Sequence, residues 1–138
     1  MIGVIVVTHG QLAHELVNAT HTIVGDLPQF VAVSIGWHDD PTVAREAISG
    51  AIARLQSPDG VLILTDMFGG TPSNLGLTFL EANRVEIITG VNLPMLIKLA
   101  HLQSSSDLLG VAREMREVGR NAIWVASDLL HAEVKIGT

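Results

Sequence analysis

The chain opens with a short apolar run, IGVIVVTHG at residues 2–10, which ends abruptly in small and polar residues. An apolar run of this length without alternation is typical of a strand that is buried on both faces, as in a parallel sheet. Residues that follow such a strand lie at the carboxyl edge of the sheet, where open α/β sheets bind their ligands. His9 is therefore the first candidate for a functional residue, and the alternative is a histidine that merely ends a strand.

Further short apolar runs alternate with segments whose apolar residues recur at helical spacing. We expect strands over 30–35, 61–64, 85–88 and 122–126, in addition to the first strand. We expect helices over 11–24, 41–55, 71–82, 94–102 and 106–118. Asp40-Pro41 and Thr71-Pro72 each resemble a helix cap followed by a proline in the first turn, and Ser106 is the expected cap of the last helix.

This alternation predicts an α/β fold, a three-layer α/β/α sandwich formed by a single domain over residues 1–138. Right-handed crossovers leave few topologies, and the flavodoxin-like strand order 2-1-3-4 is the commonest for this length. In that order the first and third strands are neighbours. His9 and Asp66 end these two strands, so we expect them to face one another at the carboxyl edge of the sheet.

The composition excludes several classes of function. The chain has no cysteine, so disulfides, thiolate catalysis and cysteine-based metal sites are excluded. A formal net charge of -6, without a basic cluster, argues against a nucleic-acid partner. No apolar run approaches the roughly 20 residues needed to span a bilayer. The first residues also lack the basic leader of a secretory signal, so we expect the protein in the cytoplasm.

A histidine beside a carboxylate has a defined chemistry. If Asp66 accepts the proton of His9 Nδ1, the lone pair of Nε2 is free to act as a nucleophile. A phosphoryl group on Nε2 would need hydrogen-bond donors, and the loop Gly69-Gly70-Thr71 offers backbone N–H groups. The start of the next helix adds the N–H groups of Ser73 and Asn74, and the hydroxyls of Thr71 and Ser73 add further donors. The alternatives are a simple turn before a capped helix and a solvated carboxylate at a strand end.

Trp37 and His38 follow the second strand, at the same edge of the sheet as His9. An exposed tryptophan there would help to dock a partner protein, because aromatic residues are enriched in interface hot spots. The alternative, a loop aromatic folded onto its own helix, is slightly preferred on the sequence alone. His14 and His21 lie seven residues apart on one helix, and two histidines without a third ligand are weak evidence for a metal site. Two further histidines have no evident role: His101 and His131.

Three motifs occur in register along the chain: THG at residues 8–10, LTDMFGGTPSN at 64–74 and ITGVNLPML at 88–96. With these motifs in this order and spacing, the sequence resembles the mannose-family EIIA component of the bacterial phosphotransferase system (PTS) over essentially its whole length. The agreement of three motifs is far more specific than any one of them.

The resemblance implies that His9 accepts a phosphoryl group at Nε2 from the phosphohistidine of the carrier HPr and passes it to a histidine of an EIIB partner. It implies that Asp66 orients His9 and that Gly70, Thr71 and Ser73 hold the phosphate, with no metal and no organic cofactor. Members of the family are typically homodimers in which the last strand joins the partner's sheet as an antiparallel edge. Residues 122–126 would play that part here.

Unlike the best-known members, the sequence shows no Ala/Pro-rich linker and no fused EIIB domain. We therefore expect HPr and EIIB on separate chains, and contact with the membrane only indirectly through EIIC and EIID. A regulatory subunit or the phosphotransfer subunit of a dihydroxyacetone kinase is an alternative within the same fold. A receiver-like signalling domain phosphorylated on Asp66 is another, but it needs an acidic pair for Mg²⁺ where Thr8-His9 stands. A binding module without chemistry is the third alternative.

Overall fold

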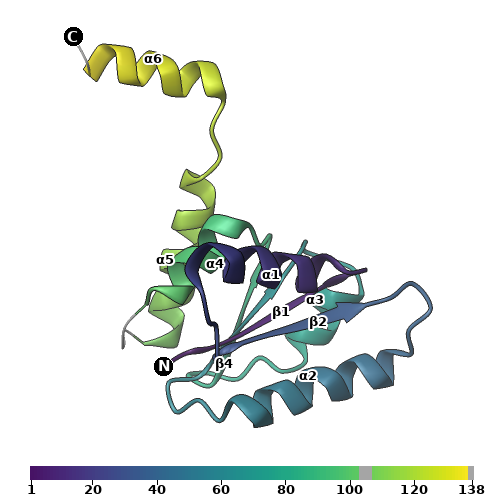
Figure 1. Ribbon diagram of the computed structural model, residues 1–138. Helices are drawn as coiled ribbons and strands as arrows, with labels where there is room; N and C mark the ends of the chain where they lie inside the picture. The colour runs from purple at the N-terminus through teal and green to yellow at the C-terminus, as the bar shows by residue number, and fades with distance from the viewer. Residues whose placement is uncertain (103–106, 137–138) are drawn as a thin grey trace.

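Four parallel strands form one sheet in the order β2-β1-β3-β4 in the computed structural model, which describes residues 1–102 and 107–136 (Figure 1). The strands are β1 (Gly3–His9), β2 (Phe30–Ile35), β3 (Val61–Thr65) and β4 (Val85–Thr89). The predicted strand order is confirmed. In the register of the sheet Val7 pairs with Thr65 and His9 pairs with Ile35, so the ends of β1, β2 and β3 meet at one edge.

Helices cover both faces of this sheet. Their bounds are α1 (Leu12–Val24), α2 (Pro41–Leu55), α3 (Thr71–Leu77), α4 (Leu93–Ala100), α5 (Leu108–Asn121) and α6 (Ala126–Ile136). Helices α1, α4 and α5 pack on one face, and α2 and α3 pack on the other. Among the residues that the structure describes, no helix is long and apolar enough to cross a membrane.

The first strand forms the centre of the core. Its successive side chains point to opposite faces, because the side-chain period of a strand is two. Val4 and Val6 join the apolar cluster under α1, α4 and α5, whereas Ile5 and Val7 join the cluster under α2 and α3. All four are at most 1% exposed, so β1 is buried on both faces, as its unbroken apolar run predicts.

Several helix ends differ from the prediction, among them the end of α5 at Asn121 instead of residue 118, and the cap and the end of α3. The first residue of α3 is Thr71 and its N-cap is Gly70, so Thr71 does not act as the cap. The same helix ends at Leu77 instead of residue 82, because the N–H of Glu81 bonds the carbonyl of Val85 and the chain turns into β4. The predicted cap Ser106 lies outside the described residues. The carboxylate of Asp107 accepts the N–H of Gly110 at the start of α5.

The segment 122–126, predicted as a fifth strand, forms no strand in this chain. Residues 123–125 have no sheet partner among the described residues, and α6 begins at Ala126. A strand needs a hydrogen-bonding neighbour, and this segment leads away from the sheet into α6, which stands apart from the layers (Figure 1). The apolar side chains of Ile123, Trp124 and Val125 are consequently exposed. Pairing of this segment with a second chain stays a prediction.

Candidate functional site

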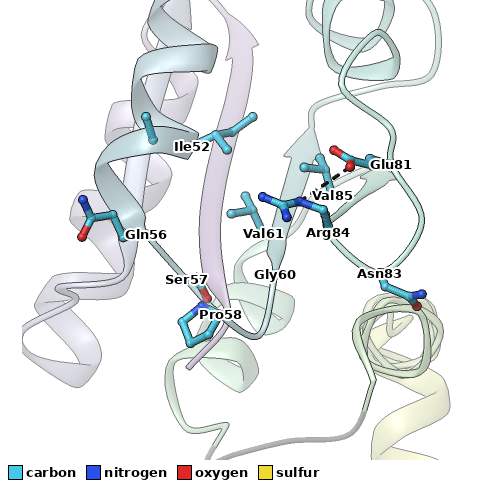
Figure 2. A pocket seen from close by; sticks show the side chains of 11 residues that line it. Ile52, Gln56, Ser57, Pro58, Gly60, Val61, Glu81, Asn83, Arg84 and Val85 are labelled. Atoms are coloured by element: carbon cyan, nitrogen blue, oxygen red, sulfur yellow. Dashed lines mark ion pairs between the residues drawn. The ribbon is translucent and has the colours of Figure 1, made fainter.

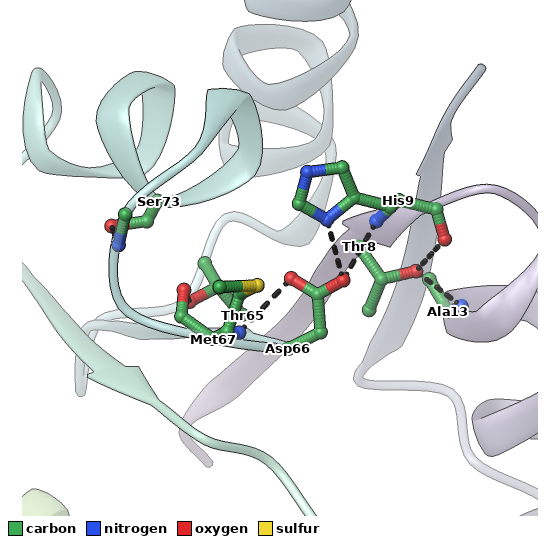
Figure 3. A network of polar contacts seen from close by, with 8 residues as sticks. Thr8, His9, Ala13, Thr65, Asp66, Met67 and Ser73 are labelled. Atoms are coloured by element: carbon green, nitrogen blue, oxygen red, sulfur yellow. Dashed lines mark hydrogen bonds and ion pairs between the residues drawn. The ribbon is translucent and has the colours of Figure 1, made fainter. Parts of the chain in front are cut away.

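His9 and Asp66 meet at the carboxyl edge of the sheet, as the strand order predicts. His9 is the last residue of β1, and Asp66 directly follows β3. The imidazole Nδ1 lies 2.8 Å from Asp66 Oδ2, and the backbone N–H of His9 donates to the same oxygen over 3.0 Å (Figure 3). The second carboxylate oxygen, Oδ1, accepts the N–H of Met67 over 3.0 Å. Asp66 therefore fixes both the main chain and the ring of His9.

The carboxyl group of Asp66 is shifted toward its charged form. Partial burial raises its pKa, but the hydrogen bonds from the backbone and ring of His9 and the attraction of that ring outweigh burial, and the net pKa lies below its usual value. A carboxylate can only accept hydrogen bonds, so the nitrogen that faces it, Nδ1 of His9, carries the proton. In the neutral imidazole the lone pair then lies on Nε2.

This second nitrogen is open to solvent. The side chain of His9 is 49% exposed, whereas that of Asp66 is 15% exposed. Nε2 lies on the far side of the ring from the carboxylate (Figure 3). The pair thus combines a shielded proton on one nitrogen with an accessible lone pair on the other, which is the arrangement that a nucleophilic histidine needs.

Gly70 packs directly against the imidazole. A β-carbon built at this position would lie 3.1 Å from both Nε2 and Cε1 of His9. The backbone of Gly70 has φ +86°, a left-handed conformation that residues with a side chain rarely adopt. A glycine at position 70 therefore lets the loop after β3 approach the reactive nitrogen, which no other residue type would permit without displacement.

The loop between Gly69 and Ser73 supplies hydrogen-bond donors next to the ring. Within residues 1–102 and 107–136, no protein acceptor is found for the N–H groups of Gly70, Thr71 and Ser73, and Gly70 gives α3 no side-chain cap. The expected donor Asn74 is already used, because its N–H bonds the carbonyl of Gly70. The hydroxyl of Ser73 is buried and accepts the N–H of Gly69 over 3.2 Å. Ser73 thus shapes the loop with its side chain, and the residue as a whole is buried.

Thr8 has a role that the sequence analysis missed. Its side chain is fully buried, and its hydroxyl accepts the N–H of Ala13 over 2.6 Å and donates to the carbonyl of His9 over 3.1 Å. The N-cap of α1, Gln11, makes no side-chain cap bond, so Thr8 satisfies the first turn of this helix from a distance. This role of Thr8 could have been predicted from the sequence, because a small hydroxyl residue stands between a buried strand and the start of a helix.

The remaining sequence candidates do not join the site. The ring of His14 bonds the hydroxyl of Ser34 over 2.6 Å, and those of His21 and His101 bond backbone carbonyls of Gly25 and Ile97. No group of three or more metal-binding side chains is found within the described part of the chain. Trp37 is 93% exposed, so the preferred reading, an aromatic folded onto its own helix, is wrong.

A hollow lies at the opposite end of the sheet, away from His9. It opens where α2 ends and where β3 and β4 begin, and an ion pair between Arg84 and Glu81, 3.6 Å apart, borders it (Figure 2). None of the five predicted site residues lines this hollow. This hollow is therefore separate from the pair His9–Asp66, which lies at the carboxyl edge of the sheet.

Comparison with known proteins identifies the family. The model for the EIIA-man family, described as the PTS system fructose IIA component, matches residues 3–115. The fructose-specific EIIA component of Bacillus subtilis is 28% identical over 94% of this chain and 90% of its own length. The mannose-specific EIIAB component of Escherichia coli K12 is 27% identical over 88% of this chain, which spans only 39% of that longer protein.

The fold agrees with these matches. A crystal structure of the PTS IIA protein associated with the fucose utilization operon of Streptococcus pneumoniae superposes with a TM-score of 0.82 at 25% identity, covering 93% of this chain and 95% of the other. A four-stranded sheet in the order 2-1-3-4, a histidine held by a carboxylate at its carboxyl edge and the family match over residues 3–115 agree with one another. The chain belongs to the EIIA-man family of phosphotransferase-system IIA components.

Proposed function

We propose that this chain, acting as one domain, carries a phosphoryl group on Nε2 of His9 between HPr and an EIIB protein. Its membership in the EIIA-man family supports the role of a phosphoryl carrier. The observation that carries the assignment to His9 is the 2.8 Å contact between Nδ1 and the ionised carboxylate of Asp66, which leaves the lone pair on the exposed nitrogen. A free lone pair on an accessible Nε2 is what an attack on phosphorus requires.

In the loading step the lone pair of Nε2 attacks the phosphorus of the donor's phosphohistidine. The P–N bond of the donor breaks, and its electron pair returns to the donor's imidazole. Nδ1 of His9 keeps its proton throughout, and the ring gains positive charge that the carboxylate of Asp66 stabilises. Delivery to EIIB reverses these changes: the P–N bond at Nε2 breaks, the ring returns to its neutral form, and the phosphoryl group forms a bond to the EIIB histidine.

The loop after β3 is proposed to hold the phosphoryl oxygens. The backbone N–H groups of the exposed residues Gly70 and Thr71 are the donors, and Gly70 lies against the ring; the buried Ser73 holds the loop through its hydroxyl. Preorganised donors of this kind contribute about 10²–10³ each to the rate of a step in which charge develops. The receiver-like alternative is disfavoured, because both oxygens of Asp66 accept hydrogen bonds from the chain itself and one of them holds His9.

The proposed assembly is a homodimer. In the described sheet β4 is an edge strand, and the apolar segment 123–125 is exposed and has no sheet partner in its own chain. An unpaired edge and an exposed apolar segment with high strand propensity favour antiparallel pairing between two copies. We propose that residues 122–126 of each chain extend the sheet of the other.

Labelling with ³²P-phosphoenolpyruvate, Enzyme I and HPr tests the role of His9. We expect a phosphoprotein that is stable in alkali and labile in acid, as phosphohistidine is, whereas an acyl phosphate on Asp66 would be lost in alkali as well. The variant His9→Ala should not be labelled, whereas the matched control His14→Ala, which removes a histidine from the start of α1, should be labelled like the wild type. Undiminished labelling of His9→Ala, or loss of the label in alkali, would contradict the proposal.

A further inference from the structure

Four large apolar side chains are exposed at the edge of the sheet that carries His9. Leu12 at the start of α1 is 46% exposed, Trp37 after β2 93%, and Met67 and Phe68 after β3 55% and 74%. Their loops are joined to the site: the N–H of Gly10 bonds Ile35 at the end of β2, and Asp66 directly precedes Met67. We call these four residues the apolar rim. Apolar side chains that gather around a reactive atom are typical of a protein-docking surface.

Trp37 is the most exposed member of the rim, and two hydrogen bonds close its loop. The carboxylate of Asp39 accepts the N–H of Gly36 over 2.6 Å, and the carbonyl of Gly36 accepts the N–H of Asp39 over 3.1 Å. The next residue, Asp40, caps α2 by accepting the N–H of Thr42. The tip of this closed turn therefore holds the backbone of Trp37 and leaves the indole in solvent, and an ordered backbone reduces the entropy lost when a partner binds.

The charges near the rim define the chemistry of the partner. The loops 9–12, 36–40, 66–73 and 90–92 contain three aspartates and no lysine or arginine. The cations beside the last of these loops, Arg116 and Arg120 on α5, are both engaged by Glu117. A phosphorylated protein carries about two negative charges at its phosphoryl group. It approaches a chain of formal net charge -6, so it must bring its own cations and gain its short-range attraction from apolar contact.

From this geometry we infer that Trp37 is the anchor through which the phosphoryl donor, a protein with a basic and apolar surface around its phosphohistidine, docks over His9. The inference rests on the proposed function of His9. The donor is favoured over the acceptor because only the donor brings the negative phosphoryl group toward this acidic edge. The donor is therefore the partner that needs apolar contact for its short-range attraction. In the delivery step that charge is already bound on His9 and leaves with the acceptor.

Kinetics of the loading step test the anchor. With phospho-HPr of Bacillus subtilis as the varied substrate, Trp37→Ala should raise KM by about thirtyfold, the effect of removing a hot spot worth about 2 kcal/mol. The rate at saturation should change little, because Trp37 does not touch the reacting atoms. Trp37→Phe should retain most of the affinity, since an aromatic ring remains. The matched control is Leu80→Ala, which truncates an apolar residue that is 53% exposed outside the loops at this edge.

Fluorescence tests the contact itself. The chain has two tryptophans, so Trp37 is the sole indole in the variant Trp124→Phe. On addition of HPr its emission should shift to shorter wavelengths and become protected from acrylamide. Emission that is unchanged while phosphoryl transfer proceeds would overturn the inference.

Further outcomes separate the inference from the proposed function. A wild-type protein that phospho-HPr does not label would overturn the proposed function, and the inference with it. Normal labelling together with an unchanged KM in Trp37→Ala would overturn the inference alone. Delivery from the preloaded protein to the EIIB part of the Escherichia coli EIIAB component should be less affected by Trp37→Ala than loading. If delivery is the step that slows, the assignment to the donor is wrong.

Discussion

The carboxyl edge of the sheet and the C-terminal segment of the chain differ in how far their side chains are satisfied by contacts within the chain. At the carboxyl edge, the backbone N–H and Nδ1 of His9 and both carboxylate oxygens of Asp66 are hydrogen-bonded within the chain. In the segment 122–130, by contrast, five large apolar side chains are exposed. The hydrogen bonds of the pair are thus made within the chain, whereas the apolar side chains of the C-terminal segment lie open to solvent.

Asp66→Asn should have the largest effect on phosphoryl transfer. The amide can donate to Nδ1, which permits the tautomer with the proton on Nε2 and removes the negative charge that stabilises the ring. Loss of the orienting carboxylate of a catalytic histidine reduces rates by up to about 10⁴ elsewhere, so we expect a fall of at least about a hundredfold in single-turnover transfer. An unchanged rate would show that the ring is oriented without Asp66.

The same variant reports on pH. Hydrogen bonds hold the pKa of Asp66 below its usual value, so its charge stabilises the folded chain above the unfolded pKa of about 4. This contribution is lost as the pH falls through the lower, folded-state pKa. The difference in free energy of unfolding between wild type and Asp66→Asn should therefore shrink below about pH 4. A difference that grows on acidification would contradict the assigned direction.

Gly70→Ala should have an intermediate effect. The added methyl group would lie 3.1 Å from Nε2, and the left-handed backbone adds strain of about 1–2 kcal/mol. We expect transfer to slow by about tenfold, as such strain displaces the loop from the ring. Gly50→Ala is the matched control: it lies inside α2 with open space around it, and alanine should stabilise that helix by roughly 0.5–1 kcal/mol.

Trp124→Ser should change the transfer chemistry least. Its indole is 59% exposed and belongs to the segment proposed to pair with a second chain. We expect the mass in sedimentation experiments to fall from dimer to monomer, while the free energy of unfolding of the monomer changes by no more than about 0.5 kcal/mol. A dimer that persists would contradict the proposed role of residues 122–126. A large loss of phosphoryl transfer would show that the site at His9 depends on the C-terminal segment.

The sequence predicts well the features that depend on contacts within the chain. It predicts poorly the features that do not. The four strands of the sheet, their order and the meeting of His9 with Asp66 follow from apolar runs and crossover handedness, which depend on the chain alone. The strand expected over 122–126 does not form, because an apolar pattern indicates burial without indicating against which molecule. The start of α3 and the use of Asn74 depend on the positive φ of Gly70. Glycine permits a positive φ but does not require it, so the sequence alone does not predict this torsion.

The exposure of Trp37 was mispredicted for a related reason. Its position is set by the hydrogen bonds between Gly36 and Asp39, which close the turn and leave the indole outside. A sequence shows that a turn is possible there but not which way its tip points. Thr8 was missed because its two hydrogen bonds join a strand to a helix across residues that look unremarkable in sequence.

One oxygen atom of Asp66 receives both the main-chain N–H and the ring nitrogen of His9. The first of these bonds does not involve a side chain at position 9 at all. A replacement there would thus leave the strand end tethered to the same point, while the reactivity disappears. The anchoring of the strand end is consequently separable from the imidazole at this position, so a chain that lacks the ring should keep the surface on which we propose that partner proteins dock.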